Sequence, residues 1–160
     1  MVAAYNIFCK NNEPTFITQI YFVNFAKKIN MNIVEKIIQS ETRQFKVVIP
    51  GVLNAHNTLF GGIALQWMDE VAYITATRFT RQKVVTVSTD KINFKHAVPY
   101  GTFVEIIGRV VEVGLIKLDV KVEIYIEHMF SEGREKVIEG KFTFAAINEE
   151  GKPVKLNIKI

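Results

Sequence analysis

Apolar and polar residues alternate along the second half of the chain in the pattern that is typical of half-buried strands. The clearest stretch runs from Ile116 to Ile126, where every second residue is aliphatic and most of the others are charged. Successive side chains of a strand point to opposite faces of the sheet, so this period of two buries one row and exposes the other. Phe103 to Val113 and Val137 to Ile147 are also predicted strands. The last of them is expected to point three residues inward: Phe142, Phe144 and Ala146.

Two further strands are predicted in the first half of the chain. Arg43 to Ile49 alternates and stops at the turn Pro50-Gly51. Val84 to Phe94 is rich in strand-forming residues, but its apolar positions change parity along the way. A bulge near Thr89-Asp90, where one extra residue shifts the alternation, accounts for this change. Ahead of the first strand, residues 32–40 are expected to form one or two helical turns.

A polar loop from Asn54 to Phe60 leads through Gly61-Gly62 into a strongly apolar segment, which is predicted to be helical to about Thr77. Paired glycines at a helix start let a ligand approach the backbone closely, because no Cβ stands in the way. The first N–H groups of a helix have no partners within it and lie at the positive end of its dipole. The start of this helix is therefore a candidate site for an oxygen that carries negative charge.

Asp69 lies two turns further along the same helix. It shares a face with Leu65, Ala72 and Ala76, since residues three and four apart stack on one side of a helix. A carboxylate among apolar side chains costs stability unless it is paired or used. The adjacent Glu70 points about 100° away, so at most one of the two carboxylates can reach solvent easily. We assign the functional role to Asp69 and treat Glu70 as exposed.

The order of elements predicts an α+β fold in two layers. One strand and one helix come first, and four strands joined by short turns follow, which makes neighbouring strands antiparallel. A long helix that is apolar nearly all round must be covered by the sheet. Residues 42–153 are expected to form this single domain, with an N-terminal extension at 1–31 and a tail at 154–160. The extension is interpreted as loosely attached, or alternatively as a short helix that docks on the domain.

The composition excludes several classes of protein. The 160 residues are 49% hydrophobic and 22% charged, which is typical of a globular domain. The net charge of +4 is spread without a dense Lys and Arg run, so a nucleic-acid partner is not expected, although a polyanionic small molecule would be attracted. No segment is expected to span a membrane; the apolar Thr15 to Ala26 is too short. The single Cys9 excludes an intramolecular disulfide and fits a cytoplasmic location.

Most familiar catalytic motifs are missing. None of the three serines (Ser40, Ser88 and Ser131) lies in a G-x-S-x-G elbow, and Cys9 lies outside the domain with no local partner. The three histidines have no metal-ligand spacing, so no metal is expected. No phosphate-binding loop or dinucleotide fingerprint is present. Asn54 and His56 remain open: each is a candidate site residue or an ordinary loop residue that braces the turn.

Several spaced motifs resemble those of the hotdog-fold acyl-CoA thioesterases, in particular the YciA-like bacterial enzymes and the cytosolic brain-type hydrolase. The motifs are Asn54 to Gly62, Met68 to Ala72, and Val84 to Ser88 with Phe94, Pro99 and Gly101, within a similarity that covers about Thr42 to Pro153. The resemblance implies an antiparallel sheet wrapped around one long central helix. It also implies a homodimer in which two sheets join, with the active site at the dimer interface, and possibly a hexamer built as a trimer of dimers.

The resemblance implies a role for each site residue. Asp69 would be the catalytic acid group and Asn54 the catalytic amide, meeting across the dimer interface. Hydrolysis of acyl-CoA places negative charge on the thioester oxygen, which N–H groups at Gly61 and Gly62 would bind, and Asp69 would activate water or attack directly. The substrate-binding candidates are His56, Phe60 and Phe94. No cofactor is expected, because coenzyme A is part of the substrate, and the activity would belong to fatty acid metabolism.

Two departures from the family pattern accompany these expectations. Relatives usually have Gly in place of Asn57, although Asn also tolerates the left-handed conformation. The turn Gly114-Leu115-Ile116-Lys117 replaces a Gly-Arg-Thr-Ser pattern of many relatives. This change suggests an alternative, a non-catalytic acyl-CoA-binding or regulatory hotdog domain, but the retention of Asn54 and Asp69 argues against it. A hotdog dehydratase or hydratase is disfavoured, because position 74, where a histidine would be needed, is Ile74.

Overall fold

The structure is a computed structural model that describes residues 32–130 and 132–158. The expectations for residues 1–31, Cys9 and Ser131 lie outside these ranges. The chain divides into two units, Met1–Lys36 with Ile160, and Ile37–Lys159. Residues 32–40 are helical, as expected for the lead-in, and the second unit contains the sheet and the long helix. No helix among the described residues combines the length and the apolar character needed to cross a membrane.

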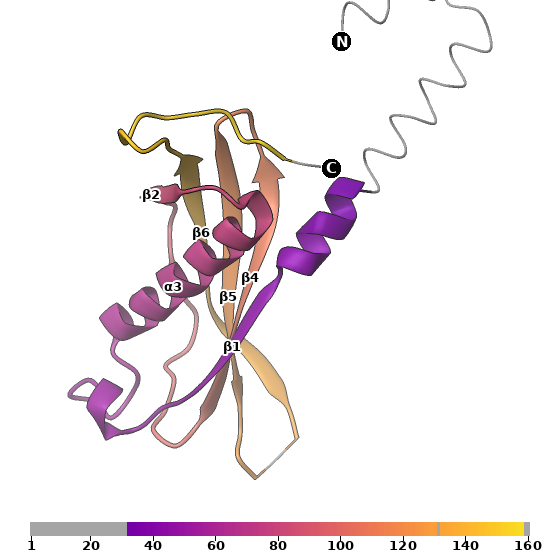
Figure 1. The fold of residues 1–160 in the computed structure, drawn as a ribbon. Helices are drawn as coiled ribbons and strands as arrows, with labels where there is room; N and C mark the ends of the chain where they lie inside the picture. Colours follow the sequence, from indigo (N-terminus) through magenta and orange to yellow (C-terminus); the bar gives the residue numbers. More distant parts are fainter. Residues whose placement is uncertain (1–31, 131, 159–160) are drawn as a thin grey trace, which may run out of the picture. The chain divides into compact units, whose positions relative to one another are not determined.

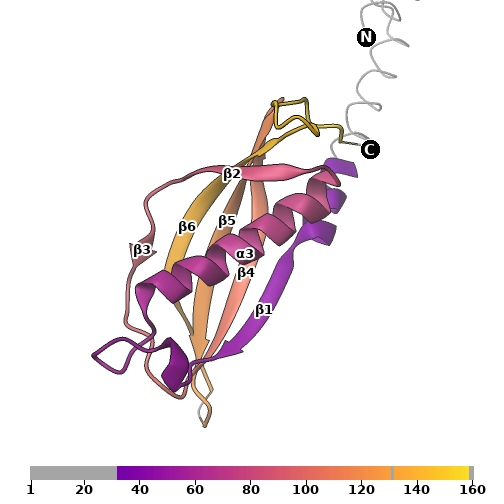
Figure 2. The ribbon, with the colours of Figure 1, turned by 60° about the vertical axis from the view of Figure 1, so that its left-hand side comes forward.

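The second unit consists of one long helix and a six-stranded antiparallel sheet. Along the chain its elements are β1 (Thr42–Val47), the 3-10 turn η1 (Pro50–Val52), α3 (Gly61–Thr80), β2 (Val84–Thr89), β3 (Asn93–Phe94), β4 (Phe103–Val113), β5 (Lys117–Glu127) and β6 (Arg134–Ala146). The strand order is β1-β4-β5-β6-β2, and the short β3 also pairs with β6. The helix lies across one face of the sheet (Figure 1, Figure 2). This is the predicted α+β arrangement.

The three central strands form two successive hairpins, and β5 is paired on both sides along most of its length. The predicted alternation of β5 is confirmed, because every even-numbered residue from Leu118 to Ile126 is buried. These residues share a face with Phe142 and Phe144 of β6, which are also buried. The hydrophobic row of β5 and the inward row of β6 therefore form the floor on which α3 packs.

Close packing between α3 and β4 depends on Gly108. A Cβ at this position would lie 2.5 Å from the Thr75 hydroxyl and 3.0 Å from a methyl of Val71. The Thr75 hydroxyl donates a hydrogen bond back to the Val71 carbonyl at 2.8 Å, so this polar group is satisfied within the helix. A glycine in a strand interior often marks such a close approach of two backbones. The helix can therefore sit deep against the sheet.

The register shift of β2 is not where the sequence pattern placed it. The shift falls between Thr86 and Ser88, so the predicted position at Thr89-Asp90 was wrong. The change in which alternate residues are apolar has two causes. A bulge shifts the alternation within β2, and the chain then leaves the sheet before it returns as the two-residue β3.

The ends of two other elements also differ from the prediction. The helix continues past Thr77 to Thr80, because its last turn is still apolar on the inner side, where Phe79 is buried. Arg81 then ends it in the left-handed conformation, with φ of 55°. The last strand, β6, begins at Arg134 rather than at Val137, because its polar first residues pair with the end of β5.

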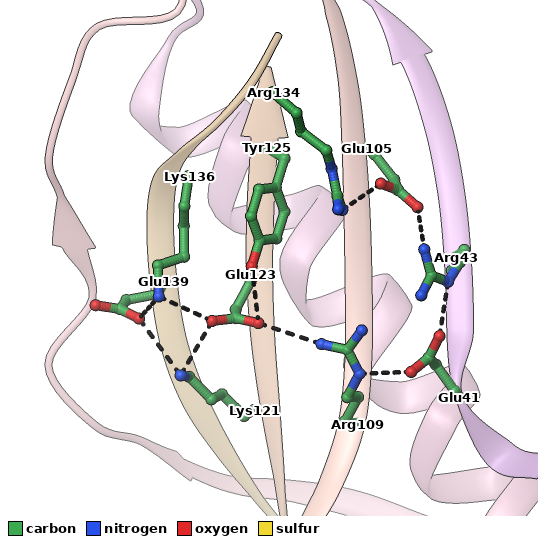
Figure 3. Close-up of polar contacts among 10 residues, drawn as sticks. All are labelled: Glu41, Arg43, Glu105, Arg109, Lys121, Glu123, Tyr125, Arg134, Lys136 and Glu139. Atoms are coloured by element: carbon green, nitrogen blue, oxygen red, sulfur yellow. Dashed lines mark hydrogen bonds and ion pairs between the residues drawn. The ribbon is translucent and has the colours of Figure 1, made fainter. Parts of the chain in front are cut away.

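The face of the sheet away from α3 carries rows of paired charges (Figure 3). Two carboxylates, Glu105 and Glu123, are buried in these rows. Each buried carboxylate has several cationic partners: Arg43 and Arg134 for Glu105, and Lys136, Lys121 and Arg109 for Glu123. Burial acts to raise the pKa of Glu123, but hydrogen bonds from Lys136 and Lys121 outweigh it, so the pKa lies below its usual value. Buried charges with this many partners are satisfied within the chain.

Candidate active site

The start of α3 has no side-chain cap. Its N-cap residue is Phe60, which offers no hydrogen-bonding side chain, and the first turn holds no acidic residue. The N–H groups of Ile63 and Ala64 bond to the Phe60 carbonyl, whereas those of Gly61 and Gly62 have no partner among the described residues. Many helices have Ser, Thr, Asp or Asn at the N-cap, where the side chain accepts a hydrogen bond from one of these first N–H groups. Two adjacent donors therefore remain available at the positive end of the helix dipole.

Aromatic rings flank both glycines. A Cβ at Gly62 would lie 2.6 Å from the ring of Phe60, and one at Gly61 would lie 3.6 Å from the ring of Phe94. The two rings are half exposed, at 53% for Phe60 and 55% for Phe94. Large apolar side chains left this open beside two unpartnered N–H groups form apolar walls around a polar centre. That combination fits a ligand with a polar group and an apolar chain.

Asn54 braces the loop that precedes the helix. Its side-chain oxygen accepts hydrogen bonds from the backbone N–H groups of His56 at 2.9 Å and Thr58 at 3.2 Å. Its amide nitrogen donates to the Thr58 hydroxyl at 2.9 Å. A side-chain amide carries two N–H donors, so one remains without a partner among the described residues. Asn57 has a φ of 57°, which confirms the left-handed conformation expected where relatives have Gly.

A cavity of about 320 Å³ lies beside the helix start. It brings together three of the predicted site residues, Asn54, Gly61 and Phe94, and its other lining residues are Thr58, Leu59, Lys95, His96, Ala97, Val98 and Ile138. The predicted candidates His56, Phe60 and Gly62 are not on this lining. His56 is exposed, and its backbone N–H rather than its ring takes part in the loop bonds.

Asp69 is placed apart from this cavity. The carboxylate is half buried, and the hydroxyl of Thr86 on β2 donates to one of its oxygens at 3.2 Å. The neighbouring Glu70 is exposed, as expected. The predicted face is confirmed for Ala72 and Ala76, which are buried, whereas Leu65 is exposed. Sequence reasoning missed Thr86, and the only available signal was its place in the quoted motif Val84 to Ser88.

One chain does not bring Asp69 to the open N–H groups. Eight residues separate Gly61 from Asp69 along α3, and a helix rises 1.5 Å per residue, so the two positions lie about 12 Å apart along the axis. A carbonyl oxygen and an attacking water on the same carbon require groups within a few ångströms of each other. The two halves of the candidate site are therefore separate in a single chain.

The surface around Asp69 is open and apolar. Leu65 and Tyr73 lie one turn before and after it on α3, and both are exposed. The neighbouring strand β2 is an edge of the sheet, and its Val85 and Val87 are exposed as well. Exposed apolar side chains beside the edge strand of a sheet are typical of an interaction surface, which makes this edge a candidate contact.

The described residues contain no group of three or more His, Cys, Asp and Glu side chains that could hold a metal ion. His96 is among the residues that line the cavity, and its ring nitrogen lies 3.2 Å from Glu135 with both side chains exposed. His96 is therefore a rim residue of the cavity and has a carboxylate partner. The groups on this part of the described chain are N–H donors and one side-chain amide beside the cavity, and one carboxylate, Asp69, apart from it.

Comparison with known proteins matches this chain to one class of enzyme. A model of the thioesterase superfamily matches residues 56–129. An acyl-CoA thioester hydrolase of Bacillus subtilis is 36% identical over 107 residues, which make up 67% of this chain and 62% of that protein. One from Zymomonas mobilis is 32% identical over 110 residues, 69% of this chain and 74% of that protein. The chain therefore belongs to the acyl-CoA thioester hydrolases of the thioesterase superfamily.

A mammalian relative shares only part of its length with this chain. The cytosolic acyl coenzyme A thioester hydrolase of rat is 30% identical over 117 residues, 72% of this chain but 31% of that protein. The chain thus spans less than two thirds of the Bacillus subtilis protein and about a third of the rat protein.

Solved structures confirm the hotdog fold. An acyl-CoA hydrolase from Bacillus cereus is 34% identical, with a TM-score of 0.74 over 78% of this chain and 76% of its own. The Staphylococcus aureus acyl-CoA hydrolase, solved with butyryl coenzyme A and coenzyme A, is 31% identical, with a TM-score of 0.72 over 75% and 73%. A hexameric acyl-CoA thioesterase is 32% identical, with a TM-score of 0.73 over 75% and 77%.

Three further structures of the Staphylococcus aureus hydrolase carry single replacements by alanine, of an aspartate, a threonine and an asparagine. In that protein the asparagine and the aspartate are 15 positions apart, and the aspartate and the threonine are 17 apart. Asn54, Asp69 and Thr86 have the same residue types at the same separations here.

Proposed function

We propose that the protein hydrolyses the thioester of an acyl-CoA to a free fatty acid and coenzyme A, at a site that two copies of the chain build together. The observation that carries this proposal is the uncapped start of α3, where the N–H groups of Gly61 and Gly62 lie beside a cavity and between two aromatic rings. The names of the relatives support the substrate class.

The proposed mechanism of hydrolysis follows from the place where negative charge develops during the reaction. A water oxygen bonds to the thioester carbon, and the carbonyl oxygen takes up negative charge, which the N–H groups of Gly61 and Gly62 bind. Preorganised donors of this kind contribute about 3 kcal/mol each to transition-state stabilisation. Asp69 accepts the proton of the water as general base. The carbon–sulfur bond then breaks, and coenzyme A leaves as the thiolate and takes up a proton.

A covalent route uses the same residues. A carboxylate oxygen of Asp69 bonds to the thioester carbon and displaces the coenzyme A thiolate, and water then opens the mixed anhydride to release the acid. In both routes we assign the remaining N–H of the Asn54 amide the task of orienting the water or the carbonyl group. The matching asparagine, aspartate and threonine of the Staphylococcus aureus hydrolase support these three positions as a unit.

The second chain is needed because the two halves of the site are about 12 Å apart along α3. Its contact surface is proposed to be the β2 edge. The sequence of β2, VVTVST, carries no charge, whereas the opposite edge strand β1, TRQFKV, has two cations. Charged residues on an edge discourage pairing, so β2 is the edge open to a second copy. Pairing of β2 with its symmetry mate covers Val85 and Val87 and brings Asp69 toward the helix start of the partner.

A larger assembly and a cytoplasmic location are further parts of the proposal. Solved acyl-CoA thioesterases related to this chain are hexameric, and the rat relative is named cytosolic. A pair of chains joined at β2 is closed by its own two-fold symmetry, so six chains correspond to three such pairs.

Release of thiol from a panel of acyl-CoAs tests the proposed activity directly. The wild-type chain and the Asp69→Asn variant are compared at equal protein concentration, with even and odd acyl chains of two to sixteen carbons. We expect turnover by the wild type and a loss of about 100-fold or more in the variant, the range typical of a missing general base. Tight binding of an acyl-CoA without turnover by the wild type would instead favour the non-catalytic acyl-CoA-binding domain.

A further inference from the structure

We propose that Ile92 closes the inner end of the space that takes the acyl chain, and that it thereby limits the length of chain that the protein binds. Ile92 lies in the connection between β2 and β3, one residue before β3 begins. The inference rests on the proposed function, because it assigns the apolar side of the cavity at the start of α3 to the acyl group. We call that side the acyl slot; it is formed by Gly61, Phe94 and Ile138.

The acyl slot begins at the start of α3, beside β3 (Figure 2). A Cβ at Gly61 would lie 3.6 Å from the ring of Phe94, and Phe94 is directly opposite Ile138 in the pairing of β3 with β6. When the thioester oxygen is bound by the N–H groups of the helix start, the acyl chain has this pair of apolar side chains next to it. Covering apolar surface favours binding, so the chain extends along Phe94 and Ile138.

The next position inward is occupied by Ile92 together with Gly140. Each lies two residues further along its strand than Phe94 and Ile138, so it faces the same way about 6.7 Å away. A Cβ at Gly140 would lie only 2.2 Å from Cδ1 of Ile92 and 3.4 Å from Cε of Met68. The side chain of Ile92 therefore fills the space that the glycine leaves free, between β6 and the helix.

One face of α3 borders both the acyl slot and its inner end. Met68 follows Gly61 by seven residues, which is about two helical turns and places both on the same side of the helix. At its first turn this side meets Phe94, and at Met68 it meets the position of Ile92 and Gly140. A path along the helix from the open N–H groups therefore runs past Phe94 and stops at Ile92.

Ile92 is held in this position from both sides. The backbone N–H of Asp90 donates to the Lys141 carbonyl at 2.9 Å, and that of Lys95 donates to the Val137 carbonyl at 2.8 Å. The Asp90 carboxylate also pairs with the Lys141 ammonium at 3.1 Å. Between these attachments the partly buried Ile92 packs against the hydrophobic core. A longer acyl chain would have to displace a fixed side chain, and forcing extra carbon atoms into a packed site is unfavourable.

Binding of S-alkyl coenzyme A thioethers, which contain no ester to hydrolyse, tests the inference on the full-length protein. Calorimetric titration with alkyl chains of two to sixteen carbons should show affinity that rises about fourfold per methylene and then stops rising where the slot ends. Ile92→Ala removes roughly three carbon atoms from that end. We expect the break to move to chains about two or three carbons longer, and thioethers beyond the wild-type break to bind about tenfold more tightly.

Two further variants separate the slot from the general packing of the core. Ile158→Ala removes the same side chain from another partly buried position against the core. Its neighbour Asn157 is bonded to Gln82, beyond the end of α3, so the break should stay in place. Adding Gly140→Ala to Ile92→Ala puts a methyl group into the space that Ile92 leaves, and the break should return toward its wild-type position.

The same break in the wild type and Ile92→Ala, or an equal shift in Ile158→Ala, would overturn the inference. If circular dichroism shows that Ile92→Ala does not fold, Ile92→Val takes its place, with an expected shift of about one carbon. A break that moves in Ile92→Ala, together with a wild type that releases no thiol from any acyl-CoA, would support the slot and refute the proposed activity. A wild type that binds none of the thioethers would overturn both proposals.

Discussion

The hydroxyl of Thr86 on β2 donates a hydrogen bond to a carboxylate oxygen of Asp69 on α3, at 3.2 Å. This bond joins the proposed catalytic acid group to the edge strand that is expected to pair with a second chain. The orientation of the carboxylate and the position of the dimer contact are therefore coupled through one side chain. Thr86 touches the acid group and not the reacting atoms, so its proposed role is that of a positioning residue.

Replacement of Thr86 by valine keeps the shape of the side chain and removes the hydrogen bond. We expect kcat to fall about tenfold with KM nearly unchanged, since a hydrogen bond to a charged group is worth about 1.5 kcal/mol or more. Steady-state kinetics with one acyl-CoA measure the two constants separately. Thr86→Ser, which restores a hydroxyl, should recover most of the rate. An unchanged kcat in Thr86→Val would mean that the bond has no part in turnover.

Gly61→Ala tests the proposed function of the start of α3 separately from the stability of the helix. The new methyl has room, because its nearest neighbour is the ring of Phe94 at 3.6 Å, and alanine favours helix over glycine by up to about 1 kcal/mol. The thermal midpoint should therefore stay the same or rise. Turnover should fall about tenfold or more, because the methyl stands where the ligand approaches the N–H groups. The control Gly51→Ala, with nothing within 4 Å, should change neither quantity; full activity in Gly61→Ala would argue against this approach route.

A charge on the β2 edge should break the proposed pair. In an antiparallel contact between two copies of β2, Val85→Lys places like charges near each other across a two-fold axis, which destabilises pairing. We expect the mass to fall toward one chain and the turnover per chain to fall with it. Val111→Lys, an equally drastic change on β4, is the control. Full turnover by a single-chain Val85→Lys would show that one chain is enough for activity.

The stability of the sheet should depend on pH through Glu139. Hydrogen bonds from Lys95 and then Lys136 lower the pKa of Glu139 from 4.5 to about 2. A carboxyl group whose pKa is lowered by folding adds stability above its unfolded pKa, and this contribution is lost as the pH falls from about 4.5 toward 2. Lys95 is well exposed, so we expect a contribution of about 1 kcal/mol at most. Denaturant unfolding of the wild type and Glu139→Gln from pH 7 to pH 3 should give curves that converge at low pH. A constant difference would refute the assignment.

The fold could be predicted because its pattern is local. The strict alternation of Ile116 to Ile126 and the apolar run after Gly62 specify a buried face without knowledge of what covers it. The bulge in β2 could not be placed, because it depends on how β2 registers against β6. The end of α3 was likewise missed, since the burial of Phe79 is decided by the sheet beneath it.

The site could be predicted only in part, for a similar reason. Asp69 is a candidate because of the conflict between a carboxylate and its apolar neighbours, and Gly61 because of its place at a helix start. Thr86 is an ordinary strand residue by pattern, and only its hydrogen bond to Asp69 of α3 points to its proposed role. The exposure of Phe45 and Val47 could not be predicted either, because nothing in the alternation of β1 says which of its faces is covered.

Mixing two inactive variants tests most directly whether the site is shared between chains. Asp69→Ala and Asn54→Ala are expected to leave little activity when each is purified alone. Co-expressed with two different tags and purified through both, the mixed pair holds one site with both residues intact and one with neither. We expect turnover to rise to about half of the wild-type value per mixed pair, as two-fold symmetry requires. Turnover no higher than that of the two parents would contradict it and place Asn54 and Asp69 in separate roles within each chain.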